Sequence, residues 1–277
     1  MPRGEVMYHM LKDNLALTIG RQGQVVGDEY LWNLALVTDS LVDFNLFYRG
    51  GELLFPLYIY KSTESKRKSQ TMMLFEPEMT YGSNGKERVP NISKEIIEKL
   101  EKAYKKKFQS KDLSPENILH YIYAVLYSNT YREKYAEFLK IDFPRIPFTS
   151  DYKLFIELAN LGEELTELHL LKHKALNKPV AKYKGKGDDK VEKPRYDEEK
   201  QIVFINDKNY FEGITQEVWN YHIGGYRVME KYLKGRKGRL IGDPAHYCKM
   251  ATALNETILL QKKIDTLFLL LEKNIIE

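Results

Sequence analysis

The sequence predicts an α+β fold in which a β-rich part with exposed loops is packed on a helical part, and a long helix closes the chain. Three observations predict it. Short apolar runs of strand length occur in residues 1–90, amphipathic helical periodicity dominates residues 91–175, and a further helical pattern starts near Pro244. Strand-like and helix-like stretches that are separated along a chain indicate the α+β class.

The first part, residues 1–90, contains the strand signals. Residues 15–19 and 34–38 are short apolar runs, and residues 54–60 are rich in aromatic and β-branched side chains. Pro56 cannot donate to a sheet ladder, which predicts an edge strand or a bulge there. The polar stretch over residues 61–90 predicts an exposed loop or an insertion.

The second part, residues 91–175, is predicted to be helical. Three helix starts are expected, at Asn91 or Ser93, at Ser114, and at Ser150 or Asp151. The start at Ser114 is well marked, because serine caps a helix and the following proline fits its first turn. Residues 143–147 contain two prolines and are predicted to be extended.

The remaining residues divide into two smaller parts within one domain of residues 1–277. Residues 176–225 are predicted to form a β-hairpin-like part, with a strand over residues 201–205 and a loop tip over residues 184–190. Residues 226–277 combine a basic loop with one long helix, predicted from about Pro244 to Glu277.

Composition bounds the class of protein. The chain has 277 residues, of which 43% are hydrophobic and 30% charged, as is ordinary for a globular protein with a sizeable core. A single cysteine, Cys248, excludes a disulfide framework and a cysteine-rich zinc site. No apolar run reaches the roughly 18 residues of a membrane helix, and the start has no signal-peptide pattern. We therefore expect a cytoplasmic protein that has no membrane partner.

Positive charge is gathered in islands. Residues 227–239 hold six basic residues against one acidic, residues 182–195 six against three, and residues 94–111 seven against three. Each island is either a solvated face or a contact surface for a polyanion.

The sequence contains none of the common catalytic motifs. The sequence has no phosphate-binding Gly-rich loop, no His-Glu-x-x-His pair and no Gly-x-Ser-x-Gly elbow. His169 and His173 are four residues apart, a spacing that can bind a metal, but no third ligand accompanies them. We expect both to be solvated at a helix end, and we predict no catalytic and no metal-binding residues.

One stretch, residues 219–239, combines aromatic, glycine and basic residues. It predicts an aromatic strand, a turn at Gly224-Gly225, a short helix and a basic loop. The aromatic residues fit a core better than a binding surface; they are Trp219, Tyr221, Tyr226 and Tyr232. Small residues let a backbone approach a polyanion, so Arg236, Lys237 and Arg239 fit phosphate contacts better than plain solvation.

Residues 219–239 resemble a block in the C-terminal specificity domain of Type ISP and related single-chain restriction–modification enzymes. Further blocks resemble the same family in the same order over nearly the whole chain, at residues 5–17, 55–60, 113–128 and 131–147. The resemblance implies that a nuclease, a helicase-like motor and an adenine methyltransferase precede such a domain.

The chain lacks the methyltransferase's Asn-Pro-Pro-Tyr/Phe motif and its S-adenosylmethionine loop. We therefore expect the end piece alone, with no cofactor of its own. S-adenosylmethionine, ATP and magnesium are implied only for the parent enzyme.

Members of such a family share a scaffold while reading different targets, so we expect base-reading residues in the loops outside the shared blocks. Arginine can bridge guanine and glutamine can bridge adenine in the major groove. The candidate DNA-binding residues are Arg21, Gln22, Lys61, Lys66, Arg67, Lys68, Gln70, Lys182, Lys184, Lys186, Lys190, Arg195, Lys234, Arg236, Lys237 and Arg239. The alternative is that these are ordinary variable loops.

The sequence thus predicts sequence-specific recognition of double-stranded DNA, with the site presented to an adjacent methyltransferase domain that flips the target adenine. Two alternatives remain open at this point. The chain is a non-catalytic docking domain of the same enzyme, or it is a fragment that retains part of a methyltransferase or nuclease activity.

Overall fold

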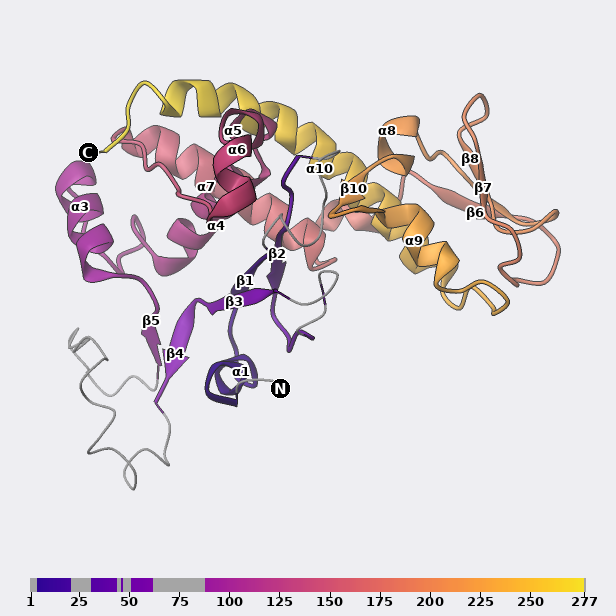
Figure 1. Cartoon of the computed structure of the whole chain (residues 1–277), viewed down its shortest axis with the longest axis horizontal. Helices are drawn as coiled ribbons and strands as arrows, with labels where there is room; N and C mark the ends of the chain where they lie inside the picture. Colours follow the sequence, from indigo (N-terminus) through magenta and orange to yellow (C-terminus); the bar gives the residue numbers. More distant parts are fainter. Residues whose placement is uncertain (1–3, 21–30, 44–45, 47–50, 62–87, 277) are drawn as a thin grey trace.

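The structure is a computed structural model that describes residues 4–20, 31–43, 46, 51–61 and 88–276. It confirms the α+β class: several small antiparallel sheets flank a group of helices, and one long helix runs along the top of the molecule in Figure 1. Among the residues described, no helix is both long and apolar enough to cross a membrane.

A three-stranded antiparallel sheet occupies the N-terminal part. It follows helix α1 (Gly4–Met10) and consists of β1 (Ala16–Ile19), β2 (Ala35–Thr38) and β3 (Leu53–Pro56), in the order β2-β1-β3. The central strand β1 is buried at every residue. Pro56 lies on the edge strand β3, opposite Ala16, which confirms the prediction from its missing backbone donor.

A second small sheet corrects the prediction for residues 54–60 and 61–90. The expected single strand is split at Leu57, whose amide donates to Leu15 O at 2.7 Å. Strand β4 (Tyr58–Tyr60) then pairs with β5 (Arg88–Pro90), so the end of the polar stretch is a strand and not a loop. Residues 62–87 of that stretch lie outside the described residues.

Five helices lie within residues 94–169, in the part predicted to be helical. They are α3 (Lys94–Tyr104), α4 (Pro115–Tyr127), α5 (Asn129–Lys134), α6 (Ala136–Ile141) and α7 (Tyr152–His169). The caps that the sequence left open are Ser93 for α3 and Asp151 for α7. At α4 the Ser114 hydroxyl accepts from the Asn117 amide at 3.1 Å, so the predicted helix start is confirmed.

Helices α4 and α7 pack closely because a glycine lies between them. A Cβ atom added at Gly162 would lie 1.8 Å from the carbonyl oxygen of His120, well inside any allowed contact. The two helices form the centre of a first hydrophobic core, in which residues such as Tyr121, Tyr123 and Leu158 are fully buried.

The predicted hairpin-like part is a larger sheet. After the short 3-10 helix η2 (Lys174–Asn177) come β6 (Lys182–Lys184), β7 (Arg195–Asp197), β8 (Ile202–Phe204) and β9 (Tyr210–Glu212), in the order β6-β9-β8-β7. All neighbouring strands are antiparallel. This sheet covers a second, smaller core that includes Val203, Phe211 and Tyr247.

The stretch after the sheet departs from the sequence prediction in two ways. It forms α8 (Gln216–Trp219), β10 (His222–Ile223), β11 (Tyr226–Arg227) and α9 (Val228–Lys234). Trp219 ends a helix instead of lying on a strand, and its ring stacks on Tyr196 with centroids 5.2 Å apart. Tyr226 was predicted in the core, but it is 41% exposed because a two-residue strand leaves no face to bury it.

Helix α10 (Pro244–Leu271) connects the two cores. Its first half contributes Cys248 and Ala251 to the second core, and its second half contributes Ile264 and Phe268 to the first. The helix ends earlier than predicted, because the chain turns back and Ile275 pairs with Thr149. Figure 1 shows α10 extending from α9 to the region of α5 and α6.

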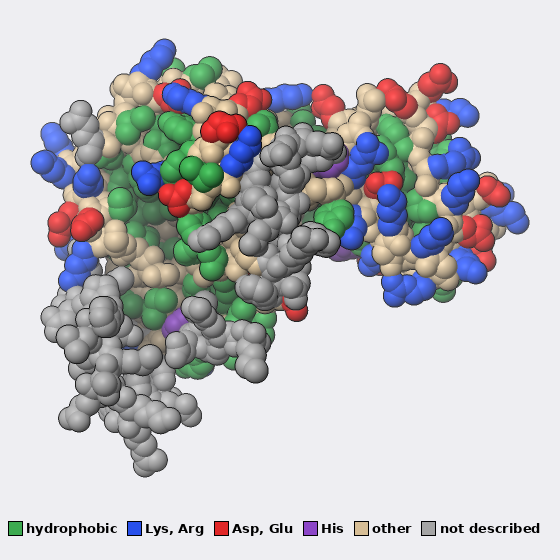
Figure 2. Space-filling view, viewed as in Figure 1, with side chains coloured by type: hydrophobic (Ala, Val, Ile, Leu, Met, Phe, Trp, Pro, Cys, Tyr) green, Lys and Arg blue, Asp and Glu red, His purple; other side chains and the backbone are tan. Residues whose placement is uncertain are grey.

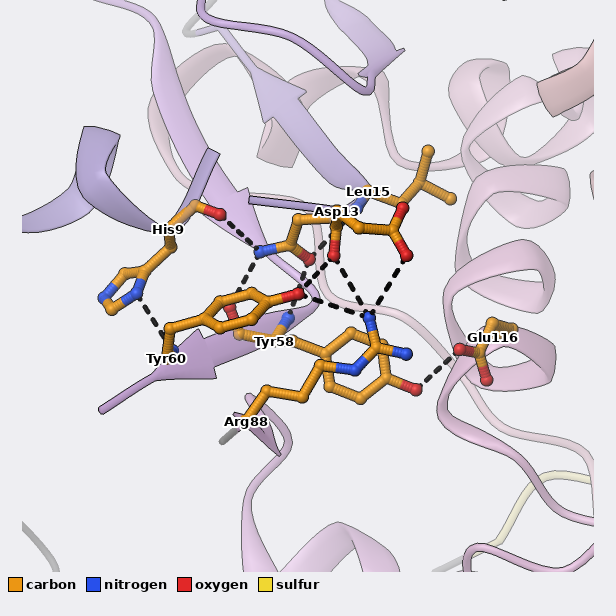
Figure 3. Close-up of polar contacts among 8 residues, drawn as sticks. His9, Asp13, Leu15, Tyr58, Tyr60, Arg88 and Glu116 are labelled. Carbon is orange, nitrogen blue, oxygen red and sulfur yellow. Dashed lines mark hydrogen bonds and ion pairs between the residues drawn. The ribbon is translucent and has the colours of Figure 1, made fainter. Parts of the chain in front are cut away.

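A polar network fastens the N-terminal part to the helices (Figure 3). The Tyr58 hydroxyl donates to Glu116 of α4 at 2.5 Å, and the Arg88 guanidinium lies 4.1 Å from the Tyr58 ring. The buried Asn14 side chain donates to Tyr58 O at 2.8 Å and accepts from Tyr58 N at 3.1 Å. His9 Nδ1 accepts from Tyr60 N at 3.0 Å, so α1 is tied to β4 as well.

Candidate nucleic-acid interface

Two basic islands that are separate in the sequence meet in the structure. Val191 N donates to Arg239 O at 2.9 Å, and Gly238 N donates to Val191 O at 2.7 Å. Lys190 and Leu240 form a β-bridge, and Ile241 N donates to Asp189 O at 2.8 Å. The loop after α9 therefore runs beside the loop between β6 and β7, and we call the joined surface the basic platform (residues 182–195 and 234–239).

The basic platform lies at one end of the molecule. Figure 2 shows lysine and arginine side chains gathered over the end that holds β6 to β9 and α9, with acidic side chains among them. The surface is thus basic in balance and not uniformly positive.

Buried amides hold the loop of the platform from beneath. Asn209 is 1% exposed; its Oδ1 accepts from Gly187 N at 2.8 Å, and its Nδ2 donates to Asp188 O at 3.0 Å. Asn206 donates to Asp188 O at 3.0 Å and to Lys190 O at 2.9 Å. Because these bonds fix the backbone, the lysines of the loop project from a defined base.

Four of the predicted lysines on the platform are available for a ligand. They are exposed and make no ion pair within the part of the chain that the structure describes: Lys182, Lys186, Lys190 and Lys237. A hydrated ammonium on a flexible stem contacts phosphate as a point charge. These four residues are therefore the strongest candidates for backbone contacts among the predicted set.

The other predicted cations of the platform already have partners. Lys184 pairs with Glu212 at 3.6 Å and Lys234 with Glu230 at 2.9 Å. The arginines lie against the protein: Arg195 over the Phe204 ring at 3.8 Å, Arg236 over the Tyr232 ring at 3.5 Å, and Arg239 donating to Gly235 O. Stacking fixes the plane of a guanidinium and leaves N–H donors at its edge. Such an arginine is suited to hydrogen bonds of fixed direction with a ligand.

The remaining candidates are not joined to this surface. Lys61 is exposed at the end of β4, far from the platform in Figure 1. The third basic island, residues 94–111, lies on and after α3, at the opposite end of the molecule from β6 and β7. The other predicted residues lie outside the described residues: Arg21, Gln22, Lys66, Arg67, Lys68 and Gln70.

Sequence reasoning missed an aromatic contact beside the platform. Tyr226 is exposed on β11, and the Lys231 ammonium lies 4.2 Å from the centre of its ring. Arg227, next to it, is exposed too. The glycine pair before Tyr226 was the signal that could have revealed this, since a two-residue hairpin places the following side chain at the surface.

The histidine pair has a structural role. His169 is enclosed, with Nδ1 bonded to the Tyr123 hydroxyl at 2.7 Å and Nε2 to Thr257 Oγ1 at 2.9 Å, so the expected solvation is wrong. Burial lowers the pKa of His169 to about 3. His173 accepts from Ala175 N and caps η2. Across the described ranges, no three histidine, cysteine or acidic side chains group as metal ligands.

An α+β domain that gathers cations on a rigid loop platform has the chemistry of a polyanion-binding module. Residues 1–261 match the model of the Type ISP C-terminal specificity domain family, and the chain belongs to that family. No curated protein matches the chain.

Solved structures that are similar to this chain include three complexes with DNA or a DNA mimic. The first is the ATP-dependent Type ISP restriction–modification enzyme LlaBIII bound to DNA, with 21% identity and a TM-score of 0.62 over 91% of this chain and 16% of that chain. The second is a nuclease-deletion mutant of the Type ISP enzyme LlaGI in complex with a DNA substrate mimic, with 19% identity and a TM-score of 0.57 over 91% of this chain and 21% of that chain. The third is a DrdV–DNA complex, with 19% identity and a TM-score of 0.65 over 95% of this chain and 25% of that chain. At these identities the similarity shows a shared fold. The chain spans a quarter or less of the length of each of these proteins.

Proposed function

We propose that this domain recognises a specific sequence in double-stranded DNA and presents that site to an adjacent adenine methyltransferase. The observation that carries the proposal is the basic platform, in which two islands distant in sequence are joined backbone to backbone. Membership in a specificity-domain family supports it, as do the DNA-bound states of the similar structures. The setting we propose is the cytoplasm.

The platform supplies two kinds of contact. Lys182, Lys186, Lys190 and Lys237 neutralise phosphates and give affinity that falls with salt. Arg195 and Arg236, whose planes are fixed by aromatic rings, are better suited to directional contacts with phosphates or base edges. Since phosphate contacts carry no sequence information, we assign base reading to the loops outside the shared scaffold.

The test is a fluorescence anisotropy titration of labelled duplex DNA at several salt concentrations. The wild-type chain should bind, with log K falling linearly against log salt, and each lost phosphate contact should reduce the slope by about 0.9. The variant K182A/K186A/K190A/K237A should show weaker binding and a shallower slope. The matched control K102A/K105A/K107A/K111A removes four charges from the distant island and should keep both the affinity and the slope. Negligible, salt-independent binding by the wild-type chain would contradict the proposal.

A second role, docking to the neighbouring domain, rests on a different observation. An apolar groove of about 610 Å³ lies between β3 and α4, and Leu53 and Phe55 on its rim are 39% and 46% exposed. The adjacent methyltransferase domain is the occupant we propose, because the chain spans so small a part of the similar enzymes. In the parent enzyme, F55S should lower methyl transfer, while the isolated domain keeps its DNA affinity.

A further inference from the structure

A cavity of about 450 Å³, lined by both apolar and polar side chains, lies at the junction between the two cores, apart from the basic platform. Its wall comes from the segment before β2, from α5, from the connection between α8 and β10, and from α10. The residues that matter for its chemistry are Trp32, Asn33, Asn129, Arg132, Tyr221 and Gln261.

Arg132 is a buried cation without a carboxylate partner. It is 5% exposed, and its Nε donates to Leu126 O at 2.7 Å. Its guanidinium carbon lies 4.8 Å from the centre of the Tyr127 ring. Within the described residues, no carboxylate oxygen lies within 4.0 Å of it. A buried charge is costly unless it is paired, so this site favours an anion from outside the chain.

Arginine has five N–H donors in a planar fork. The carbonyl of Leu126 accepts from one of them, the Nε–H group. Donors remain on the guanidinium where it borders the cavity, and guanidinium groups match the geometry of phosphate.

The cavity wall is held in place by its own hydrogen bonds. Gln261, which is 4% exposed, donates to Tyr127 O at 3.0 Å and to Asn129 Oδ1 at 3.2 Å, and accepts from the Tyr221 hydroxyl at 3.3 Å. Asn33 donates to His222 O at 2.8 Å and accepts from Gly224 N at 2.8 Å. A wall fixed in this way exists before a ligand arrives, which reduces the cost of binding.

One acid, Glu217, lies at the rim and not beside the cation. Its side chain is 68% exposed and its nearest cation is Lys262, at 3.7 Å. It therefore leaves the charge of Arg132 uncompensated, while disfavouring an extended polyanion at the entrance. The electrostatics suit a ligand with a single small anionic group.

We propose that this cavity binds one phosphate-bearing nucleotide. The Arg132 guanidinium would hold the phosphate, the ring of Tyr221 would pack on the base, and the amides would contact base or sugar edges. A volume of about 450 Å³ is at the lower end of the range for small-ligand sites, as a mononucleotide requires. The nucleotide is either free in solution or an extrahelical unit of DNA, and the second source rests on the proposed function.

A fluorescence titration tests this, because the chain has only two tryptophans and Trp32 lines the cavity. In the variant W219F, Trp32 is the sole reporter. Its emission should change saturably with deoxyadenosine monophosphate, or with a duplex that carries a one-nucleotide bulge. Response to the monophosphate identifies the free source, and response to the bulged duplex alone identifies the DNA source. Deoxyadenosine without phosphate should bind at least ten-fold more weakly.

Two further variants separate binding from folding. R132Q in the W219F background should weaken nucleotide binding by ten-fold or more, and R132K should restore part of it. If R132Q does not fold, N220A decides, since Asn220 is an exposed cavity residue whose loss should weaken binding several-fold. The platform variant K182A/K186A/K190A/K237A should keep the Trp32 response to the monophosphate, which makes failure of this inference distinguishable from failure of DNA recognition.

The inference is overturned if neither the monophosphate nor the bulged duplex changes Trp32 emission. Inorganic phosphate that binds as tightly as the monophosphate would also overturn it, because the base would then contribute nothing. So would a nucleotide response that survives R132Q unchanged.

Discussion

Val191 and Arg239 are joined through their backbones, with Val191 N donating to Arg239 O at 2.9 Å while the neighbouring Gly238 N donates back to Val191 O at 2.7 Å. This pairing fixes the register between the two basic islands. The spacing of the cations on the platform is therefore a property of backbone hydrogen bonds and not of mobile side chains.

Substitution of Gly238 should loosen that register. Its φ is +80°, a conformation that L side chains rarely adopt, although no atom would obstruct a Cβ. G238A should therefore cost about 1 kcal/mol locally, and DNA affinity should fall several-fold in the anisotropy titration. The control is G225A, at an exposed glycine without a positive φ. Equal affinities of G238A and the wild-type chain would count against a fixed platform.

The contact between α4 and α7 should not tolerate a methyl group. A Cβ at Gly162 would lie 1.8 Å from His120 O, which is backbone and cannot rotate away. G162A should lower the free energy of unfolding by about 3 kcal/mol, at the upper end of typical overpacking costs, as measured by urea denaturation. N160A, at an exposed position of the same helix, should change it little. A fully stable G162A would show that the helices can separate without cost.

Acid should destabilise the domain through His169. Burial lowers its folded-state pKa to about 3, whereas the unfolded chain keeps a pKa near 6.5. Between these values the unfolded chain binds a proton that the folded chain does not, so stability is present above about pH 6.5 and is lost as the pH falls. H169Q should remove up to about 1.4 kcal/mol per pH unit from this slope, measured by denaturation from pH 7 to pH 4.

H173Q is the matched control for the acid series and should keep the slope, since His169 is unchanged in it. Some slope should remain in H169Q as well, because burial also lowers the pKa of His120, to about 4. An H169Q variant with the full wild-type slope would show that other groups are responsible for the acid sensitivity.

The Asn14 side chain should be essential for attaching the N-terminal part. It bonds to both backbone groups of Tyr58 and also to His9 O at 3.2 Å and Leu15 N at 3.0 Å. N14A would leave buried backbone groups without partners, at about 1–3 kcal/mol for such a loss. The measurement is hydrogen exchange, with faster exchange expected in β4 and unchanged exchange in α7. Unchanged protection in β4 would contradict this role.

Much of the helical part was predictable because its signals are local. Ser114 with Pro115 gave the start of α4, and the two prolines of residues 143–147 gave an extended segment. A cap and a proline act within one turn of backbone, so neither depends on distant residues.

The errors arose where tertiary contacts decide. Trp219 was predicted on a strand, but the Thr215 hydroxyl caps a short helix there and the ring packs on Tyr196. The burial of His169 in the first core was equally hidden, because residue spacing along α7 cannot show that Tyr123 and Thr257 lie against this side chain. The meeting of two basic islands depends on backbone bonds between residues far apart in sequence.

Helix α10 has a mechanical consequence. Twenty-eight residues of helix span about 42 Å, and residues at both ends are locked into different cores. The helix therefore couples the two ends rigidly. A displacement of the basic platform is transmitted along α10 to α5 and α7. One continuous helix therefore sets the distance and the angle between a ligand bound at the platform and a neighbouring domain that contacts the helical part.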